Sequence, residues 1–293
     1  MSDLDDLLAF LREQPMLSQV PLAEQRVQYD RAQKAFQLPA GVTTRADRFG
    51  GVPGEYLTVA GAAADRQILY LHGGGYGIGS PRSHRHLAAA IGLAAGADVL
   101  VPDYRLAPEH PFPAALDDAL AALAWLAADR PAARRVVAGD SAGGGLTVSV
   151  LVAARDRGGP AVAAGVCLSP WVDLDCDPAS PVAQAAATDP VVGFDDLVGF
   201  SRNYLGGAAA AAPLASPIHA ELRGLPPLLV QASSSEALRF DAERLAAAAQ
   251  AAGVAVELEM VPGVPHVWHW FWPRLDLGRR SIDRIGAWLR PHW

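Results

Sequence analysis

Lysine is almost absent from this chain of 293 residues: Lys34 is the only one, and arginine supplies the other 23 of the 24 basic residues. This scarcity excludes a Gly-Lys-Ser/Thr phosphate loop and a Ser-x-x-Lys nucleophile, because each needs a lysine in its motif. Cysteine is equally rare. Cys167 and Cys176 form no C-x-x-C pair and cannot build a zinc site alone. A disulfide between them stays open, although the apolar stretch around Cys167 argues against it.

Charge of either sign is scarce, and no apolar run is long. Charged residues make up 19% and hydrophobic residues 51%, which excludes a disordered chain and predicts a sizeable core. The net charge of −7 argues against nucleic-acid binding, which needs a basic surface. Residues 1–6 are acidic, unlike a secretory signal, and the longest apolar run, residues 87–97, is shorter than the roughly 18–20 residues of a membrane span. We therefore expect a soluble cytoplasmic protein without nucleic-acid or membrane partners.

Short apolar, β-branched runs alternate with helix-like segments through most of the chain. Near-continuous apolar strands are typical of a parallel sheet that is covered on both faces. The pattern predicts the α/β class, with a mostly parallel central sheet and helices on both faces. The expected strands lie at residues 55–60, 67–71, 97–101, 135–138, 164–168, 227–232 and 254–261. The expected helices between them lie at residues 84–95, 113–128, 142–156, 241–252 and 278–289.

Two segments differ from this alternation. At the start of the chain, leucines at helical spacing predict a helix over residues 4–11, and a second, polar helix is expected over residues 22–36. Residues 171–225 are rich in proline, alanine and aspartate, with one expected helix at 195–205. An insertion of this length is more typical of a lid than of a linker.

The sequence Gly139-Asp-Ser-Ala-Gly143 lies between an expected strand and an expected helix. This is the context of the nucleophile elbow, in which Ser141 occupies a sharp turn that only small neighbours allow. The helix that begins at Ala142 would direct its amide groups at the reacting oxygen. An ordinary glycine-rich turn is the alternative, because Gly-x-Ser-x-Gly alone is a weak signal.

A second glycine turn, His72-Gly-Gly-Gly75, follows the expected strand at residues 67–71. Glycines let main-chain amides converge on an oxyanion without obstruction by side chains. No register matches Gly-x-Gly-x-x-Gly, which argues against a dinucleotide cradle. His72 is a weak candidate for the base, and we expect it to fix the loop by hydrogen bonds. His84 and His86 stand two apart on a helix, so we expect an exposed polar face there rather than metal ligands.

A serine nucleophile needs a histidine base that a carboxylate orients, in the chain order serine, acid, histidine. His266 follows the last expected strand, at the strand end where such a base stands. His269 ranks only second, because its place in an aromatic run argues against it. His219 falls in the expected lid, so we expect it to be structural. Glu236 is the first carboxylate after the preceding strand, and Asp241 is the alternative acid at the start of the next helix.

Together these motifs resemble the hormone-sensitive-lipase-like family of α/β-hydrolases, in its bacterial carboxylesterase branch. The likeness covers about residues 50–290 and includes His72-Gly-Gly-Gly-Tyr76, Asp103-Tyr-Arg-Leu-Ala-Pro-Glu-His-Pro111, Gly139-Asp-Ser-Ala-Gly-Gly144, Leu168-Ser-Pro-Trp171 and Gly263-Val-Pro-His266. The chain departs from the family at the acid, where members commonly read Asp-Pro-Leu-Arg or Ser-Asp-Glu. Here Ser235-Glu236 stands instead, and a glutamate can orient the histidine as an aspartate does.

The resemblance implies that Ser141 is the nucleophile and His266 the base, with oxyanion amides from Gly74, Gly75 and Ala142. It also implies an α/β-hydrolase core under a helical cap. The core would comprise residues 51–171 and 223–293, and the cap would comprise N-terminal helices in residues 1–50 and the insertion 172–222.

We therefore expect a serine carboxylesterase that hydrolyses short- to medium-chain acyl or aryl esters through an acyl-enzyme, without a metal or an organic cofactor. Another acyl substrate (a lactone, an amide or an acetylated sugar) is the alternative, followed by a non-catalytic small-molecule receptor, against which His266 argues. Pairing of the last strand between two copies would give a homodimer. Six aromatic residues suggest an apolar pocket, with core packing as the equal alternative: Trp171, Phe194, Phe200, Trp268, Trp270 and Phe271.

Overall fold

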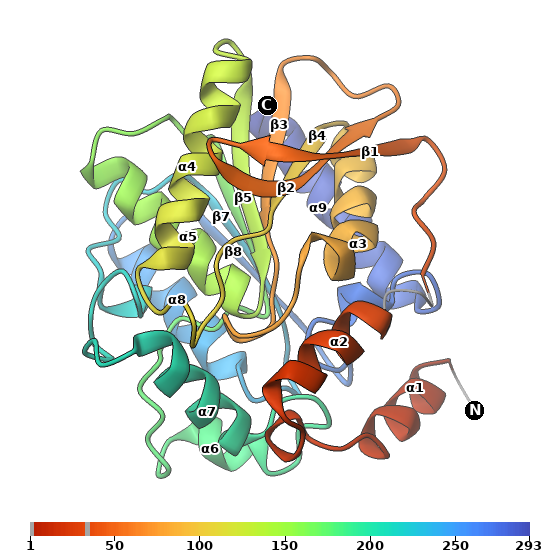
Figure 1. The fold of residues 1–293 in the computed structure, drawn as a ribbon, viewed down its shortest axis with the longest axis vertical. Coiled ribbons are helices and arrows are strands. Elements are labelled where there is room, and N and C mark those ends of the chain that lie inside the picture. Colours follow the sequence, from red (N-terminus) through yellow and green to blue (C-terminus); the bar gives the residue numbers. More distant parts are fainter. Residues whose placement is uncertain (1–2, 33–35) are drawn as a thin grey trace.

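The computed structural model describes residues 3–32 and 36–293, which fold around one eight-stranded sheet (Figure 1). In chain order the strands are β1 (Val42–Phe49), β2 (Val52–Val59), β3 (Arg66–Leu71), β4 (Asp98–Pro102), β5 (Arg134–Asp140), β6 (Ala164–Leu168), β7 (Leu228–Ser233) and β8 (Val256–Val261). They lie side by side in the order β1-β2-β4-β3-β5-β6-β7-β8. From β4 to β8 all neighbours are parallel, whereas β2 pairs antiparallel with both β1 and β4. The expected mostly parallel sheet is confirmed.

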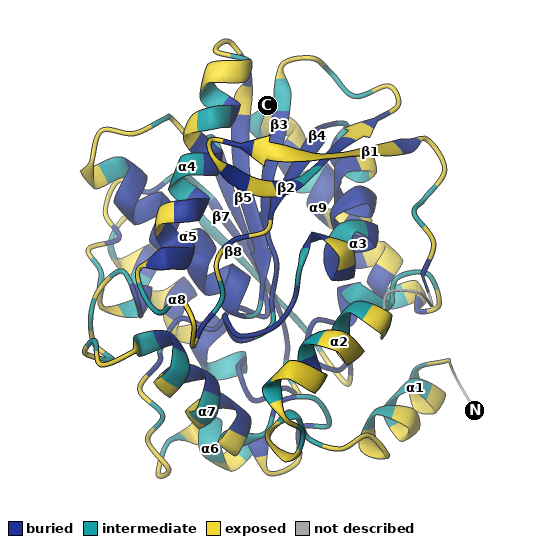
Figure 2. Cartoon of the chain, in the orientation of Figure 1, coloured by how far each residue is buried: buried dark blue, intermediate teal, exposed yellow. Residues whose placement is uncertain are grey.

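Helices cover both faces of this sheet, because the central strands carry apolar side chains on both sides. In β3, Ile68 and Tyr70 join one apolar cluster, and Leu69 and Leu71 join the other. The first cluster includes α3 (Pro81–Ala95) and α9 (Asp276–Leu289). The second includes α4 (Ala114–Asp129), α5 (Ala142–Asp156) and α8 (Arg239–Ala251). Figure 2 shows the central strands buried and the outer helix faces exposed.

Strand β1 corrects the expectation that residues 1–50 form cap helices only. Six of its eight side chains are exposed, so the strand has no apolar alternation by which it could be found. It belongs to the sheet because Gly50 and Gly51, with φ of 64° and 85°, turn the chain back so that β1 pairs with β2. A Gly-Gly pair is a hairpin signal, which could have predicted this strand.

The expected elements are otherwise confirmed, with ends that differ by up to a few residues. Helix α3 begins three residues before the expected one, because Ser80 caps it and Pro81 starts its first turn. The helix expected at 22–36 is α2 (Leu22–Ala32), and residues 33–35 of that prediction lie outside the described residues. The short helix α6 (Pro181–Ala186) was not predicted.

Two segments lie over the carboxyl ends of the strands (Figure 1). The N-terminal one contains α1 (Asp3–Arg12), the 3₁₀ turn η1 (Leu17–Gln19) and α2. The second contains α6, α7 (Phe194–Leu205) and the turn η3 (Pro217–His219). They meet where the Ser18 amide donates to the Asp196 carboxylate. No helix within residues 3–32 and 36–293 has the length and apolar character needed to cross a bilayer.

Candidate active site

Ser141 occupies the turn between β5 and α5. Its backbone has φ 53° and ψ −122°, a conformation that a residue with a side chain rarely adopts. The turn is crowded: a Cβ on Gly139 would collide with the Gly143 carbonyl, and a Cβ on Gly143 would collide with the Leu71 carbonyl. A strained serine between two glycines, at the end of a buried strand, is the geometry that the motif predicted.

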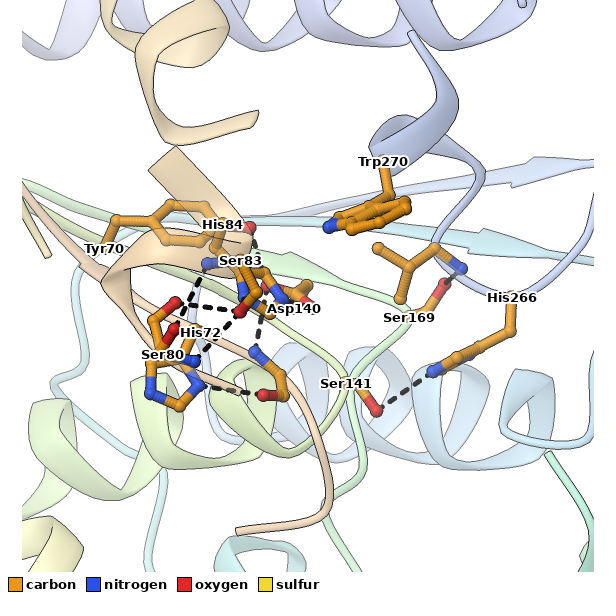
Figure 3. Close-up of polar contacts among 12 residues, drawn as sticks. Tyr70, His72, Ser80, Ser83, His84, Asp140, Ser141, Ser169, His266 and Trp270 are labelled. Atoms are coloured by element: carbon orange, nitrogen blue, oxygen red, sulfur yellow. Dashed lines mark hydrogen bonds and ion pairs between the residues drawn. The ribbon is translucent and has the colours of Figure 1, made fainter. Parts of the chain in front are cut away.

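His266 reaches this serine from the loop after β8. Its Nε2 lies 2.9 Å from Ser141 Oγ (Figure 3), and its Nδ1 lies 2.9 Å from Glu236 Oε2. An ionised carboxylate can only accept, so Nδ1 carries the proton and Nε2 is left to accept the serine proton. The structure thus brings together the three residues that the sequence predicted for the triad.

Burial and charge oppose each other in the Glu236–His266 pair. Glu236 is only 1% exposed, and its Oε1 accepts the Ser233 amide at 3.3 Å. Burial raises the pKa of Glu236, while His266 acts in the opposite direction. Burial is the largest single effect on His266 and acts to lower its pKa, but the charge and hydrogen bond of the Glu236 carboxylate, together with the charges of Asp189 and Asp140, raise that pKa above its ordinary value. The carboxylate therefore favours the imidazolium that forms when His266 accepts a proton.

The alternative acid and the second-choice base lie in other contacts. Asp241 Oδ2 accepts the amides of Val172 and Asp173 at 2.8 and 3.0 Å, so this carboxylate fixes the start of the insertion. His269 Nε2 lies 2.9 Å from Gln231 Oε1, and burial lowers the pKa of His269 to about 3. Both groups are therefore structural in this geometry.

Two further histidines take structural contacts as well. His72 Nδ1 donates to the Gly73 carbonyl at 2.8 Å, and its ring stacks on Tyr104 with a centroid distance of 4.1 Å. Burial lowers the pKa of His72 to about 3, so the ring stays neutral and fixes the glycine turn, as expected. His219 lies in η3, where its Nε2 is 3.6 Å from Asp173 Oδ1.

The predicted oxyanion amides come from two turns beside the serine. Gly74 and Gly75 line the same cavity as Ser141, with φ of 111° and 58°. The amides of Gly77 and Ile78 donate to the Gly74 carbonyl and close this turn. Ala142 is the first residue of α5, where backbone amides have no partner within the helix. Such amides can stabilise the negative oxygen of a tetrahedral intermediate.

Asp140 connects these two turns, a role that the sequence analysis missed. Its Oδ1 accepts the Gly73 amide at 3.1 Å and the Tyr70 hydroxyl at 2.7 Å, and its Oδ2 lies 3.4 Å from His84 Nε2 (Figure 3). Burial acts to raise the pKa of Asp140, but His84 and the hydrogen bonds lower it overall. The sequence signal is weak: Asp140 stands next to Ser141, but its partner Gly73 lies 67 residues away.

The expectation of an exposed polar face at His84 and His86 was wrong, because both side chains are buried. His84 faces Asp140, while His86 Nε2 donates to the Trp270 carbonyl at 2.9 Å. The Phe36 ring also stacks on His86 at 4.6 Å, so segments from both ends of the chain cover this part of α3. In the described part of the chain, no three His, Cys, Asp or Glu side chains are grouped to hold a metal ion.

A cavity of about 400 Å³ opens onto Ser141 and His266. Four of the six aromatic residues suggested for a pocket line it: Trp171, Phe200, Trp270 and Phe271. Trp268 packs in the core instead, and Phe194 lines a separate cavity. The cysteines, which the sequence allowed to form a disulfide, are both free thiols.

Comparison with known proteins identifies the family to which the chain belongs. Residues 68–270 match the family described as alpha/beta hydrolase fold. A Streptomyces hygroscopicus protein named acetyl-hydrolase is 47% identical over 275 residues, covering 90% of this chain and 88% of that protein. Carboxylesterase NlhH of Mycobacterium tuberculosis is 35% identical over 209 residues, covering 68% of this chain and 65% of that protein.

A crystal structure of an esterase from the bacterial hormone-sensitive lipase family has a TM-score of 0.93 with 44% sequence identity, covering 99% of this chain and 98% of that chain. These likenesses agree with the elbow, the glycine turn and the buried Glu236–His266 pair. The chain belongs to the α/β-hydrolase family, in its hormone-sensitive-lipase-like branch, and is a carboxylic ester hydrolase.

Proposed function

We propose that this chain hydrolyses esters of short- to medium-chain acyl groups, or aryl esters, through an acyl-enzyme formed on Ser141. The observation that carries the proposal is the continuous hydrogen-bonded path from Ser141 Oγ through His266 to Glu236, at the wall of a cavity. Each group has the protonation that the chemistry needs at the start: a serine hydroxyl, a neutral imidazole and a carboxylate.

In the first half-reaction, Ser141 Oγ attacks the ester carbonyl carbon while His266 Nε2 takes its proton. The amides of Gly74, Gly75 and Ala142 stabilise the negative oxygen, and a single such donor is typically worth about 10²–10³ in rate. The imidazolium then protonates the leaving alcohol as the acyl–oxygen bond breaks. In the second half, His266 activates a water, which releases the acid and restores Ser141.

The size of the cavity supports a small substrate. About 400 Å³ lies near the lower end of the range for small-molecule sites, roughly 300–1,000 Å³. The name acetyl-hydrolase of the Streptomyces relative supports a preference for short acyl groups.

Two further expectations stay predictions. One is a cytoplasmic location, and the other is the division into core and cap at residues 51–171, 172–222 and 223–293.

The test is hydrolysis of p-nitrophenyl acetate and butyrate by the wild type and by Ser141→Ala. The substitution should lower kcat by at least about 10³-fold, because it removes the atom that forms the acyl bond. Ser149→Ala, on the helix α5 that follows Ser141, is the matched control and should keep wild-type turnover. Mass spectrometry after acid quenching should detect the acyl group on the wild type and on Ser149→Ala, but not on Ser141→Ala. Undiminished turnover in Ser141→Ala would refute the proposal.

A further inference from the structure

Helix α2 contributes polar side chains to the wall of the substrate cavity. Gln25, Gln28 and Tyr29 line the same cavity as Ser141. They stand three and four residues apart, so they share one face of the helix. We call these three side chains the α2 polar face. Esters of plain alkyl acids and alcohols have no donor to offer it, so the proposed function leaves this face unexplained.

Both glutamines of this face are oriented with their oxygens unused. Gln25 Nε2 donates to the carbonyls of Leu17 and Val20, both at 2.7 Å. That fixes its amide and leaves Oε1, which is buried and has no hydrogen-bond partner among the described residues. Gln28 Nε2 donates to Glu24 Oε1 at 2.9 Å, so its own Oε1 is again the atom left for another partner. Gln28 Oε1 is the one of these two oxygens that a ligand in the cavity can reach, because Gln25 Oε1 has almost no surface open to the cavity.

Tyr29 completes the face. Its ring packs beside Trp270 and His84, with centroid distances of 6.2 and 5.8 Å. Within residues 3–32 and 36–293, its hydroxyl forms no hydrogen bond. Burial and then the charge of Asp140 raise the pKa of Tyr29, so the hydroxyl keeps its proton. The hydroxyl oxygen has lone pairs that can accept a hydrogen bond from a ligand in the cavity that Tyr29 lines.

We propose that the α2 polar face is a subsite for a hydrogen-bond donor of the substrate, a hydroxyl or an amide N–H. Gln28 and Tyr29 offer oxygens that can accept a hydrogen bond, and the negative charge of Asp140, another residue that lines the cavity, disfavours an anionic group at this wall. The inference rests on the proposed function and narrows its substrate class to esters with a hydroxyl or N–H group near the scissile bond.

The experiment uses pairs of esters in which a hydroxyl replaces a terminal methyl. On the acyl side the pair is p-nitrophenyl 3-hydroxypropanoate and p-nitrophenyl butyrate. On the alcohol side it is 2-hydroxyethyl acetate and propyl acetate, followed in a pH-stat. The ratio of kcat/KM within each pair is measured for wild type, Tyr29→Phe and Gln28→Met. Comparing the ratio between variants cancels the intrinsic reactivity of each ester.

Tyr29→Phe should lower the ratio of hydroxylated to all-carbon ester about threefold to tenfold in one pair, the effect of one lost hydrogen bond. Gln28→Met should lower the ratio in the same pair. The matched control is Tyr204→Phe, a buried tyrosine that stacks on Tyr76 at 3.7 Å, and it should keep both wild-type ratios. Thermal unfolding of each variant checks that the fold is retained.

If Tyr29→Phe leaves the kcat/KM ratio unchanged in both pairs, the subsite is overturned. The proposed function still holds in that case, provided that hydrolysis depends on Ser141. A third ester, p-nitrophenyl methoxyacetate, can accept but not donate. If Tyr29→Phe lowers kcat/KM for this ester, relative to butyrate, as much as for the hydroxylated ester, the subsite is also overturned. Such a result would identify a hydrogen-bond acceptor as the ligand. If the wild type hydrolyses none of these esters, both proposals fail.

Discussion

At the scale of single residues, His266 is subject to two effects of opposite sign. Burial disfavours its charged form, and the Glu236 carboxylate favours it. Burial is the largest single effect, but the carboxylate opposes it through both its charge and its hydrogen bond, since it lies 2.9 Å from Nδ1 and is itself shielded from solvent. The charges of Asp189 and Asp140 act in the same direction as Glu236. The imidazole therefore binds a proton more readily than a free histidine does.

This shift sets the acid limb of the pH profile. Protonated His266 cannot accept the serine proton, so kcat/KM should fall as the pH falls through the pKa of His266 in the free enzyme. Because that pKa is raised, the midpoint should lie above the ordinary value of 6.5. A profile of kcat/KM for p-nitrophenyl butyrate between pH 5 and 9 measures it. A midpoint at or below 6.5 would show that the carboxylates around His266 do not outweigh its burial.

The choice between Glu236 and Asp241 makes a second prediction. Glu236→Gln removes the charge that favours the imidazolium, so kcat should fall at least about 10²-fold. Asp241→Asn should stay within about threefold of the wild type, because an amide oxygen can still accept the amides of Val172 and Asp173. Both variants are compared on p-nitrophenyl acetate at pH 8. A dead Asp241→Asn beside a normal Glu236→Gln would reverse the assignment.

Local motifs made Ser141, His266 and Glu236 predictable, since each follows a recognisable apolar strand. Asp140 stands inside one of these motifs, yet its role depends on Gly73, which is distant in sequence. The burial of His84 depends in the same way on what packs against it. Spacing along one helix cannot reveal a partner from another element, so contacts of this kind need the folded structure.

At the scale of elements, α2 is tied to the oxyanion turn by one side chain. Arg26 Nε donates to the Gly77 carbonyl at 2.8 Å, and its Nη2 donates to the Ala107 carbonyl at 2.9 Å. The same guanidinium forms two hydrogen bonds with the Glu109 carboxylate, at 2.8 and 2.7 Å. Because Gly77 donates to Gly74, the position of α2 bears on the turn that supplies the oxyanion amides.

Arg26→Leu should therefore lower kcat about tenfold, because the turn that supplies the oxyanion amides becomes less ordered without the carbonyl contacts of Arg26. Glu109→Gln is the matched control: it alters only the exposed ion pair, which is worth little, and keeps both carbonyl contacts. Steady-state kinetics on p-nitrophenyl acetate separates kcat from KM in both variants. Equal, small losses in the two variants would show that the carbonyl contacts do not matter.

Strand β1 and helix α2 show where prediction of the elements ends. The buried parallel strands were predictable because each is an apolar run. β1 is an exposed antiparallel strand, and only the Gly50-Gly51 turn marks it. The packing of α2 against the oxyanion turn follows from Arg26, whose surroundings cannot be derived from a polar helical pattern.

At the scale of the whole molecule, Asp241 joins the core to the segment above it. It lies in the first turn of α8 and accepts the amides of Val172 and Asp173, just after the chain leaves β6. The homodimer expected through β8 stays a prediction.

Burial raises the pKa of Asp241 to about 7, with the charge of Asp173 acting in the same direction and Arg244 in the opposite one.

This raised pKa gives stability a specific pH dependence. In the unfolded chain the pKa of Asp241 has its ordinary value of 3.8, so the folded state binds this proton more tightly. Its contribution to stability is therefore complete below pH 3.8 and is lost progressively as the pH rises towards 7. Asp241→Asn, which cannot ionise, should gain stability over the wild type by about 2–3 kcal/mol more at pH 8 than at pH 5. Urea unfolding at both pH values measures the difference. The control is Asp283→Asn, at an exposed acid on α9, whose stability difference from the wild type should be the same at both pH values. If the stability difference for Asp241→Asn is also the same at both pH values, the Asp241 carboxylate is not desolvated in the folded protein.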